Sequence, residues 1–151
     1  MAKVQGYYYL HENGDLIYKP YDEGRVADFR ESPFVKAFWP LDTSDRETAW
    51  TTLVEALAAG ANAGRVKELA DKWSCTDKDA EVYAGVVGAK LERDGAKWCA
   101  TPPRFVDLVV SKAGFGETCL EALAALAKEL GYRPAKMWGP TFKGLLKEAG
   151  K

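Results

Sequence analysis

The side chains that could carry out acid–base or nucleophilic chemistry are few in this sequence. It contains one histidine, His11, and three cysteines, without any Cys-x-x-Cys spacing. A histidine-based catalytic triad would need His11, which lies beside an expected hairpin turn, and a His/Cys zinc site needs more ligands. Acidic clusters within 42–47 and 77–81 fall in first helical turns, where the helix dipole favours carboxylates without any site. We therefore expect no enzymatic activity, no metal and no cofactor.

The C-terminal segment combines positive charge with aromatic side chains. Residues 131–151 carry five basic side chains and one acidic one, although the whole sequence has 21 basic and 22 acidic residues. Basic and aromatic groups together suit single-stranded nucleic acid or an acidic protein surface. The candidate partner-binding residues of this tail are Tyr132, Arg133, Lys136, Trp138, Phe142, Lys143 and Lys147. The alternative is a structural tail, in which Trp138 and Phe142 pack on the domain and the lysines stay in solvent.

These groups must be positioned by secondary structure, which the N-terminal part of the sequence indicates clearly. Residues 7–18 read as two strands around Asn13-Gly14, a pair that supplies the two positive φ angles of a type I′ hairpin turn. Residues 34–39 are expected to form a third strand that ends at Pro40. Their alternation places Phe34 and Lys36 on one side and Val35, Ala37 and Trp39 on the other, so one face of the strand should be drier.

Capping residues and periodic apolar stripes predict three helices in the middle of the chain. A capping box at residues 44–47 opens a helix over about 45–59, and a short helix follows near 66–73. A break at 74–76 precedes a helix over 77–91. The inward side chains of that helix are expected to be Ala80, Tyr83, Val87 and Leu91. Residues 93–95 then form a second hairpin turn before a strand over 97–100.

A strand, a glycine-marked turn and a helix are expected over residues 105–131. β-Branched and aromatic residues at 105–111 follow a double proline, which favours a strand. Residues 118–121 form another capping box, so the helix should begin at Thr118 and end at Leu130, before Gly131. Gly114-x-Gly116 precedes this helix, but the adjacent acidic residue and the lack of a following Lys-Ser/Thr argue against a phosphate loop.

These elements predict one α+β domain over residues 1–151. It should contain antiparallel sheet from two hairpin–strand–helix units, with a helical hairpin between them. The order of parts at 7–59 recurs at 91–130, and residues 55–59 and 121–125 are identical, which suggests a degenerate repeat. The alternative is coincidence between alanine-rich helices. A chain of this length can bury a core without a disulfide or metal, so the cysteines are expected to be buried thiols in a reducing compartment.

Local resemblances to known families add to this interpretation. Residues 66–76, the helix after them and the hairpin at 93–95 resemble a winged helix-turn-helix, in which the second helix enters the DNA major groove. Ser74 stands where that family usually has glycine, and the second helix begins with Asp77-Lys78-Asp79, which phosphates would repel. Residues 116–123 resemble the Gly-x-Thr-x-x-Glu-Ala motif of HicB-type antitoxins. Over its whole length, the chain is similar to small proteins of unknown function encoded by phages and prophages of proteobacteria.

The sequence thus favours a non-enzymatic phage or prophage accessory protein that binds a host or phage macromolecule, as a regulator or inhibitor. A protein partner is expected. The alternative is a nucleic-acid-binding transcriptional regulator that uses residues 65–100 or the basic tail. Neither a membrane span nor a secretory signal is expected, because there is no apolar run of sufficient length. We therefore expect the cytoplasm of a bacterial host, while the oligomeric state is left open.

Overall fold

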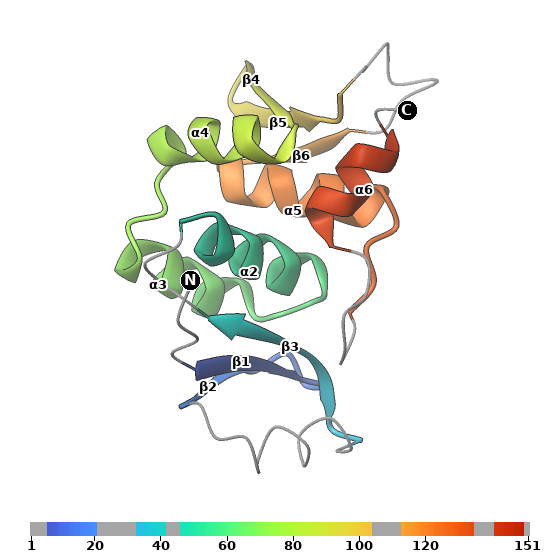
Figure 1. Ribbon diagram of the computed structural model, residues 1–151. Helices are drawn as coiled ribbons and strands as arrows, with labels where there is room; N and C mark the ends of the chain where they lie inside the picture. Colours follow the sequence, from blue (N-terminus) through green and yellow to red (C-terminus); the bar gives the residue numbers. More distant parts are fainter. Residues whose placement is uncertain (1–5, 21–32, 42–45, 104–112, 135–140, 150–151) are drawn as a thin grey trace.

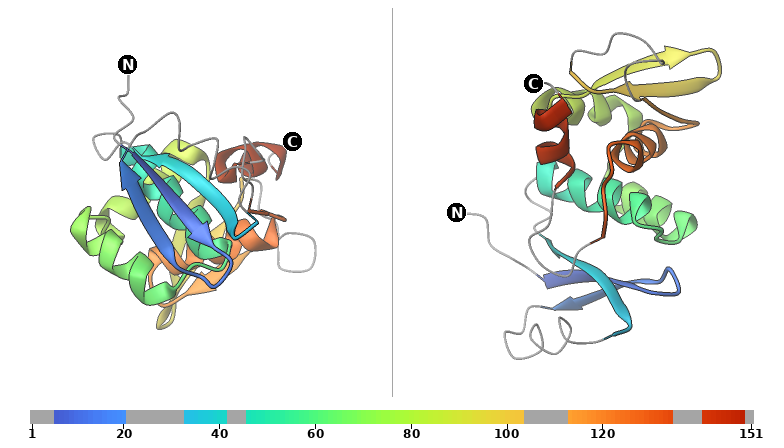
Figure 2. Two further views of the ribbon diagram at one scale, coloured as in Figure 1. Left: turned by 90° about the horizontal axis from the view of Figure 1, so that it is seen from below. Right: turned by 90° about the vertical axis from the view of Figure 1, so that its right-hand side faces the viewer.

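A computed structural model describes residues 6–20, 33–41, 46–103, 113–134 and 141–149 (Figure 1). Within them, the chain has five α-helices and two three-stranded antiparallel sheets, so the expected α+β class is confirmed. The two sheets lie at opposite ends of the molecule, with helices between them, as Figure 1 and the right-hand view of Figure 2 show. No helix in these segments is both long and apolar enough to cross a membrane.

The first sheet has the strand order β2-β1-β3. Its strands are β1 (Gly6–His11), β2 (Leu16–Pro20) and β3 (Val35–Leu41). The predicted alternation in β3 is confirmed, because Val35, Ala37 and Trp39 are buried and Lys36 is exposed. The predicted end at Pro40 is wrong: the strand continues, with Pro40 opposite Tyr7. A proline is tolerated there because β3 is an edge strand, where a missing N–H need not break a ladder.

The first hairpin forms as predicted, but its turn is of another type. Gly14 has a φ of +96°, whereas Asn13 is not among the non-glycine residues with positive φ, so the type I′ assignment is wrong. The His11 N–H donates to the Asp15 carbonyl at 2.8 Å, and the Gly14 N–H donates to the His11 carbonyl at 2.9 Å. This is a longer loop, in which a single left-handed glycine follows a tight turn.

Helix α2 (Arg46–Ala58) lies at the centre of the molecule. It is buried almost all round, and its buried residues include the polar side chains of Thr52 and Glu55. The capping residue predicted for it, Ser44, lies outside the described residues. Helix α3 (Ala63–Lys72) begins earlier than predicted, because the Asn62 side chain accepts the Arg65 N–H at 3.0 Å and caps it.

Helix α4 (Asp77–Val87) is shorter than the predicted helix over 77–91. Gly88 ends it in the left-handed conformation, with a φ of +94°. Leu91 is therefore not an inward residue of this helix, and the prediction is wrong at that position. It belongs instead to β4 (Lys90–Asp94), which pairs with β5 (Lys97–Thr101) in the predicted second hairpin.

The second sheet has the order β4-β5-β6, and β6 (Gly114–Gly116) is a short edge strand. The predicted strand over 105–111 lies outside the described residues. The two glycines of β6 are needed for close packing on α5 (Cys119–Glu129): a Cβ at Gly116 would lie 2.7 Å from the Ala122 nitrogen. A Cβ at Gly114 would collide with the backbone at Leu126.

The start and end of α5 are confirmed. Thr118 caps it by accepting the Glu121 N–H at 3.2 Å, and Gly131 follows its end with a φ of +90°. The Glu121 carboxylate, however, accepts the N–H of Glu117, at 3.0 Å. The predicted capping box would have paired it with the N–H of Thr118, one residue later. Leu123 and Leu126 are fully buried, and α5 packs on both β6 and α2.

The two proposed halves differ in connectivity. The first sheet has the first strand of its hairpin in the centre, whereas the second sheet has the second strand there. The identical pentapeptides also differ in environment, since Glu55 is buried and Glu121 is exposed. The degenerate repeat stays a prediction.

Candidate interaction surface

The inner side of α4 is fixed to α2 by an aromatic contact. The ring of Tyr83 stacks on that of Trp50, with centroids 5.6 Å apart and an interplanar angle of 14°. The Tyr83 hydroxyl and Thr51 Oγ1 are hydrogen-bonded at 2.8 Å. Burial raises the pKa of Tyr83, so the phenol stays protonated. Because these contacts set both the position and the rotation of the helix, they determine which α4 side chains face outward.

The first turn of α4 is held to α5. The Asp77 carboxylate accepts the backbone N–H of Cys119 at 3.0 Å, and Thr76 caps α4 through the N–H of Asp79. Burial and the Asp77 carboxylate together raise the pKa of the Cys119 thiol to about 12. A protonated thiol is a poor nucleophile, so this cysteine has a structural role.

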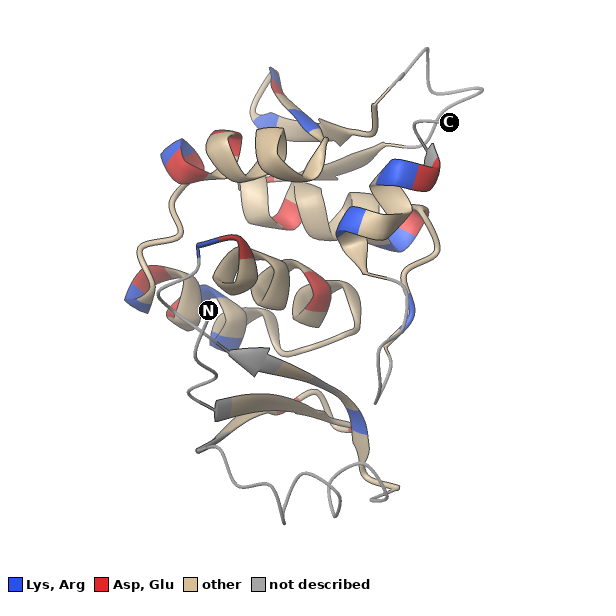
Figure 3. Ribbon diagram, viewed as in Figure 1, with Lys and Arg blue, Asp and Glu red and all other residues tan. Residues whose placement is uncertain are grey.

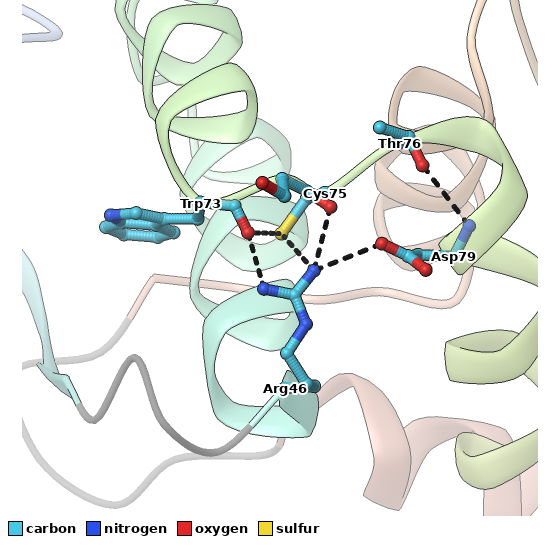
Figure 4. Close-up of polar contacts among 6 residues, drawn as sticks. Arg46, Trp73, Cys75, Thr76 and Asp79 are labelled. Carbon is cyan, nitrogen blue, oxygen red and sulfur yellow. Dashed lines mark hydrogen bonds and ion pairs between the residues drawn. The ribbon is translucent and has the colours of Figure 1, made fainter.

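Arg46 clamps the turn between α3 and α4, as Figure 4 shows. Its guanidinium donates to the carbonyl of Trp73 and, at 2.9 Å, to that of Ser74. It also contacts the Cys75 sulfur at 3.7 Å and pairs with the Asp79 carboxylate at 3.3 Å. The planar fork of an arginine can make these contacts at once, which a lysine cannot. Ser74 has a φ of +56°, the conformation that the glycine of a helix-turn-helix would adopt easily.

The outward side of α4 is apolar at its centre, and no contact among the described residues explains this. Val82 is 71% exposed and Val86 is 53% exposed. Gly85 lies between them, and a Cβ there would meet nothing within 4 Å. A glycine in an exposed helix interior costs about 1 kcal/mol relative to alanine, and neither a positive φ nor a close contact within the described chain requires it. We call the exposed residues Lys78, Glu81, Val82, Gly85 and Val86 the α4 face.

Helix α4 differs from a DNA-reading helix in charge and packing. Asp77, Asp79 and Glu81 outnumber Lys78 at the start of α4, as Figure 3 shows, and acidic groups repel phosphates. The order of α2, α3, α4 and the following hairpin matches the winged helix-turn-helix resemblance. However, α3 and α4 each pack on α2 rather than mainly on each other.

The predicted tail residues are divided between the core and the surface. Tyr132 is buried and Phe142 is completely buried. Lys143, in helix α6 (Phe142–Ala149), forms an ion pair with Glu47 at 3.0 Å. Arg133 and Lys147 are exposed, whereas Lys136 and Trp138 lie outside the described residues. The two described aromatic residues are thus packed in the core, away from solvent.

Glu55 joins this tail to the core, and sequence reasoning missed it. Its carboxylate accepts the Trp39 indole N–H and the Phe142 backbone N–H, both at 3.0 Å, as well as a hydrogen bond from Tyr132. The residue is only 5% exposed, and burial raises the pKa of its carboxyl group. A carboxylate within the apolar run 53–58 of α2 was the available signal, because such a segment is buried and a buried acid needs donors.

The residues first considered for chemistry do not come together. The His11 ring stacks on Phe34 beside the hairpin turn, with an interplanar angle of 4°. Burial raises the pKa of the thiols of Cys75 and Cys99, which disfavours the reactive thiolate. Among the described segments, no group of three His, Cys, Asp or Glu side chains could hold a metal ion.

Comparisons with known proteins found no match in family models, in curated proteins or in solved structures. The candidate interaction surface therefore rests on the geometry of the α4 face.

Proposed function

We propose that this protein acts by binding a macromolecule, and that its partner is a protein that contacts the α4 face. The observation that carries the proposal is the exposure of Val82 and Val86, at 71% and 53%, on a helix that is otherwise held firmly in place. Apolar side chains on a rigid helix can bury their surface in a partner with little loss of conformational entropy. The resemblance of the sequence to phage and prophage proteins supports a role as a regulator or inhibitor in the cytoplasm of a bacterial host.

The competing proposal is a nucleic-acid-binding transcriptional regulator. The left-handed Ser74 and the hairpin that follows α4 favour it, and the exposed Arg133 and Lys147 could contact phosphates. The acidic start of α4 opposes it, as does the burial of the two described tail aromatics, which therefore cannot stack on bases. We therefore rank it second.

A pull-down from a proteobacterial lysate, with and without nuclease, separates the two proposals. Wild type should recover a protein that survives nuclease, and Val82→Asp should lose it. Phe115→Asp is the matched control, because Phe115 is 41% exposed on β6, at the far edge of the second sheet from β4. Recovery of nuclease-sensitive material alone, unchanged in Val82→Asp, would overturn the protein-binding proposal.

The role of the tail is tested by replacing Lys136, Lys143 and Lys147 with glutamine. If the tail contacts a polyanion, these changes should weaken retention on single-stranded DNA and flatten its salt dependence, because fewer counterions are released. Under our leading proposal, retention should be weak in wild type and unchanged in the variant.

A further inference from the structure

We infer that helix α6 is a releasable latch that controls the α4 face: while it is docked it holds α4 in place, and its release loosens α4. The inference rests on the proposed function, since it concerns the regulation of the same surface. It is carried by a row of polar side chains on α2 that bonds both α4 and α6.

One side of α2 anchors the two helices. Glu47, Thr51 and Glu55 follow one another at a spacing of four residues, so they lie on the same side of the helix. Glu47 pairs with Lys143 of α6 at 3.0 Å, and Glu55 accepts the first backbone N–H of α6, also at 3.0 Å. Thr51, between them, is hydrogen-bonded to the Tyr83 hydroxyl of α4. Helices α4 and α6 also contact each other directly. The position of α4 therefore depends on the side of α2 that α6 covers.

The hydrogen bond that anchors α4 is sensitive to what happens to α6. Burial is the largest cause of the raised pKa of Tyr83, and the charges of Glu55 and Glu47 raise it further, so both acids lie near this phenol. Release of α6 would let water reach the Glu55 carboxylate and raise the local dielectric constant. The bond between Thr51 and Tyr83 would then weaken, because a hydrogen bond is electrostatically stronger in a low-dielectric interior.

Helix α6 is short enough to be released without the rest of the fold. It has 8 residues, and isolated helices shorter than about 12–15 residues are marginal in water, so it is helical only while docked. Docking completely buries Phe142 and Leu146. The pair between Lys143 and Glu47 stays partly open to solvent, at 43% and 37% exposure. A short element held by few buried side chains belongs to the least stable part of a fold.

The state of the latch sets how well the α4 face binds. Val82 and Val86 bury their surface in a partner with little loss of entropy only while α4 is rigid. A partner that meets a loosened α4 must also order the helix, so its affinity falls. By linkage, a partner bound at the α4 face makes α6 dock more firmly.

Hydrogen exchange of the purified full-length protein, followed by mass spectrometry, tests the latch. Leu146→Ala removes a buried side chain of α6 and leaves the α2 row unchanged. It should speed exchange about tenfold or more in α6, and clearly in α4 as well. Leu16→Ala is the matched control, because Leu16 is also buried but lies in β2, in the first sheet. In this control, α6 and α4 should exchange as in wild type. Faster exchange in α6 alone, or an equal increase in every segment, would overturn the inference.

Wild type gives a second test that does not depend on how a variant folds. In urea below the unfolding midpoint, α6 and α4 should lose their protection together, before α2 and α5 do. If α4 instead keeps its protection until α2 loses it, α4 is not controlled by the tail and the inference is refuted.

These measurements involve no partner, so they separate the inference from the proposed function. A lysate partner that is lost in Val82→Asp, together with α4 exchange that is unchanged in Leu146→Ala, would leave the function standing and remove the inference. Joint release of α6 and α4, without any lysate partner, would do the reverse. If both hold, Leu146→Ala should recover less of the partner than Leu16→Ala does.

Discussion

Removal of the Glu55 carboxylate should loosen the tail from the core. Glu55→Ala leaves the Trp39 indole N–H and the Phe142 N–H without their acceptor, and both groups are buried. A buried donor that loses its partner costs about 1–3 kcal/mol, so two such donors together cost about 2–6 kcal/mol. We therefore expect Glu55→Ala to lower the free energy of unfolding by about 3–5 kcal/mol. Glu55→Gln, which keeps one acceptor oxygen, should cost about 1–3 kcal/mol.

A comparison of wild type with Glu55→Gln gives a prediction about the pH dependence of stability. Because the folded state raises the pKa of Glu55, it holds the proton more tightly than the unfolded state does. The stabilisation by the neutral acid is therefore complete below the unfolded pKa, about 4.3, and is lost as the pH rises through the raised folded value. Glutamine does not titrate. The free energy of unfolding of wild type, minus that of Glu55→Gln, should thus fall as the pH rises from about 4.

Urea unfolding of the three proteins at several pH values measures these quantities. The other carboxylates titrate alike in wild type and Glu55→Gln, so their effects cancel in the difference. A difference that grows with pH would mean that the folded state favours the carboxylate anion, and the reasoning on burial would be refuted. A loss below about 1 kcal/mol in Glu55→Ala would show that the two N–H groups find other partners.

Substitutions at three further positions test how the elements are held, each by its urea midpoint at constant m-value. Thr118→Ala should cost about 1 kcal/mol through the lost cap of α5, and an unchanged midpoint would contradict that helix start. Gly116→Ala should cost about 1–3 kcal/mol, because its Cβ must push strand and helix apart, and a neutral result would refute their close packing. Arg46→Ala should cost about 1–2 kcal/mol, since it releases two carbonyls of the α3–α4 turn. Arg46→Lys should not restore the loss, because a lysine lacks the fork, and full rescue by lysine would contradict the clamp.

Local patterns predicted the elements, and long-range packing explains most of what they missed. The hairpins, the buried side of β3 and the cap at Thr118 follow from rules that act within a few residues. The burial of Glu55 does not, because the same five-residue sequence places Glu121 in solvent. The two glutamates differ in the hydrogen-bond donors that distant segments of the chain place beside them.

The sequence predicted only part of the α4 face and of the contacts that position it. The inward set Ala80, Tyr83 and Val87 was predicted correctly, and it implies which side chains face outward. The Arg46 clamp was not predictable, because it joins α2 to a turn 27 or more residues later. The two glycines of β6 were considered only for anion binding, whereas their role depends on how closely α5 approaches.

Site-specific photo-crosslinking tests the central claim most directly, because it reports what touches the α4 face in the cell. A photoreactive phenylalanine analogue would replace Val82 in one protein and Phe115 in another, and both would be illuminated in a bacterial host. The account predicts an adduct with another protein at position 82 and none at position 115. Adducts at 115 without any at 82 would contradict it.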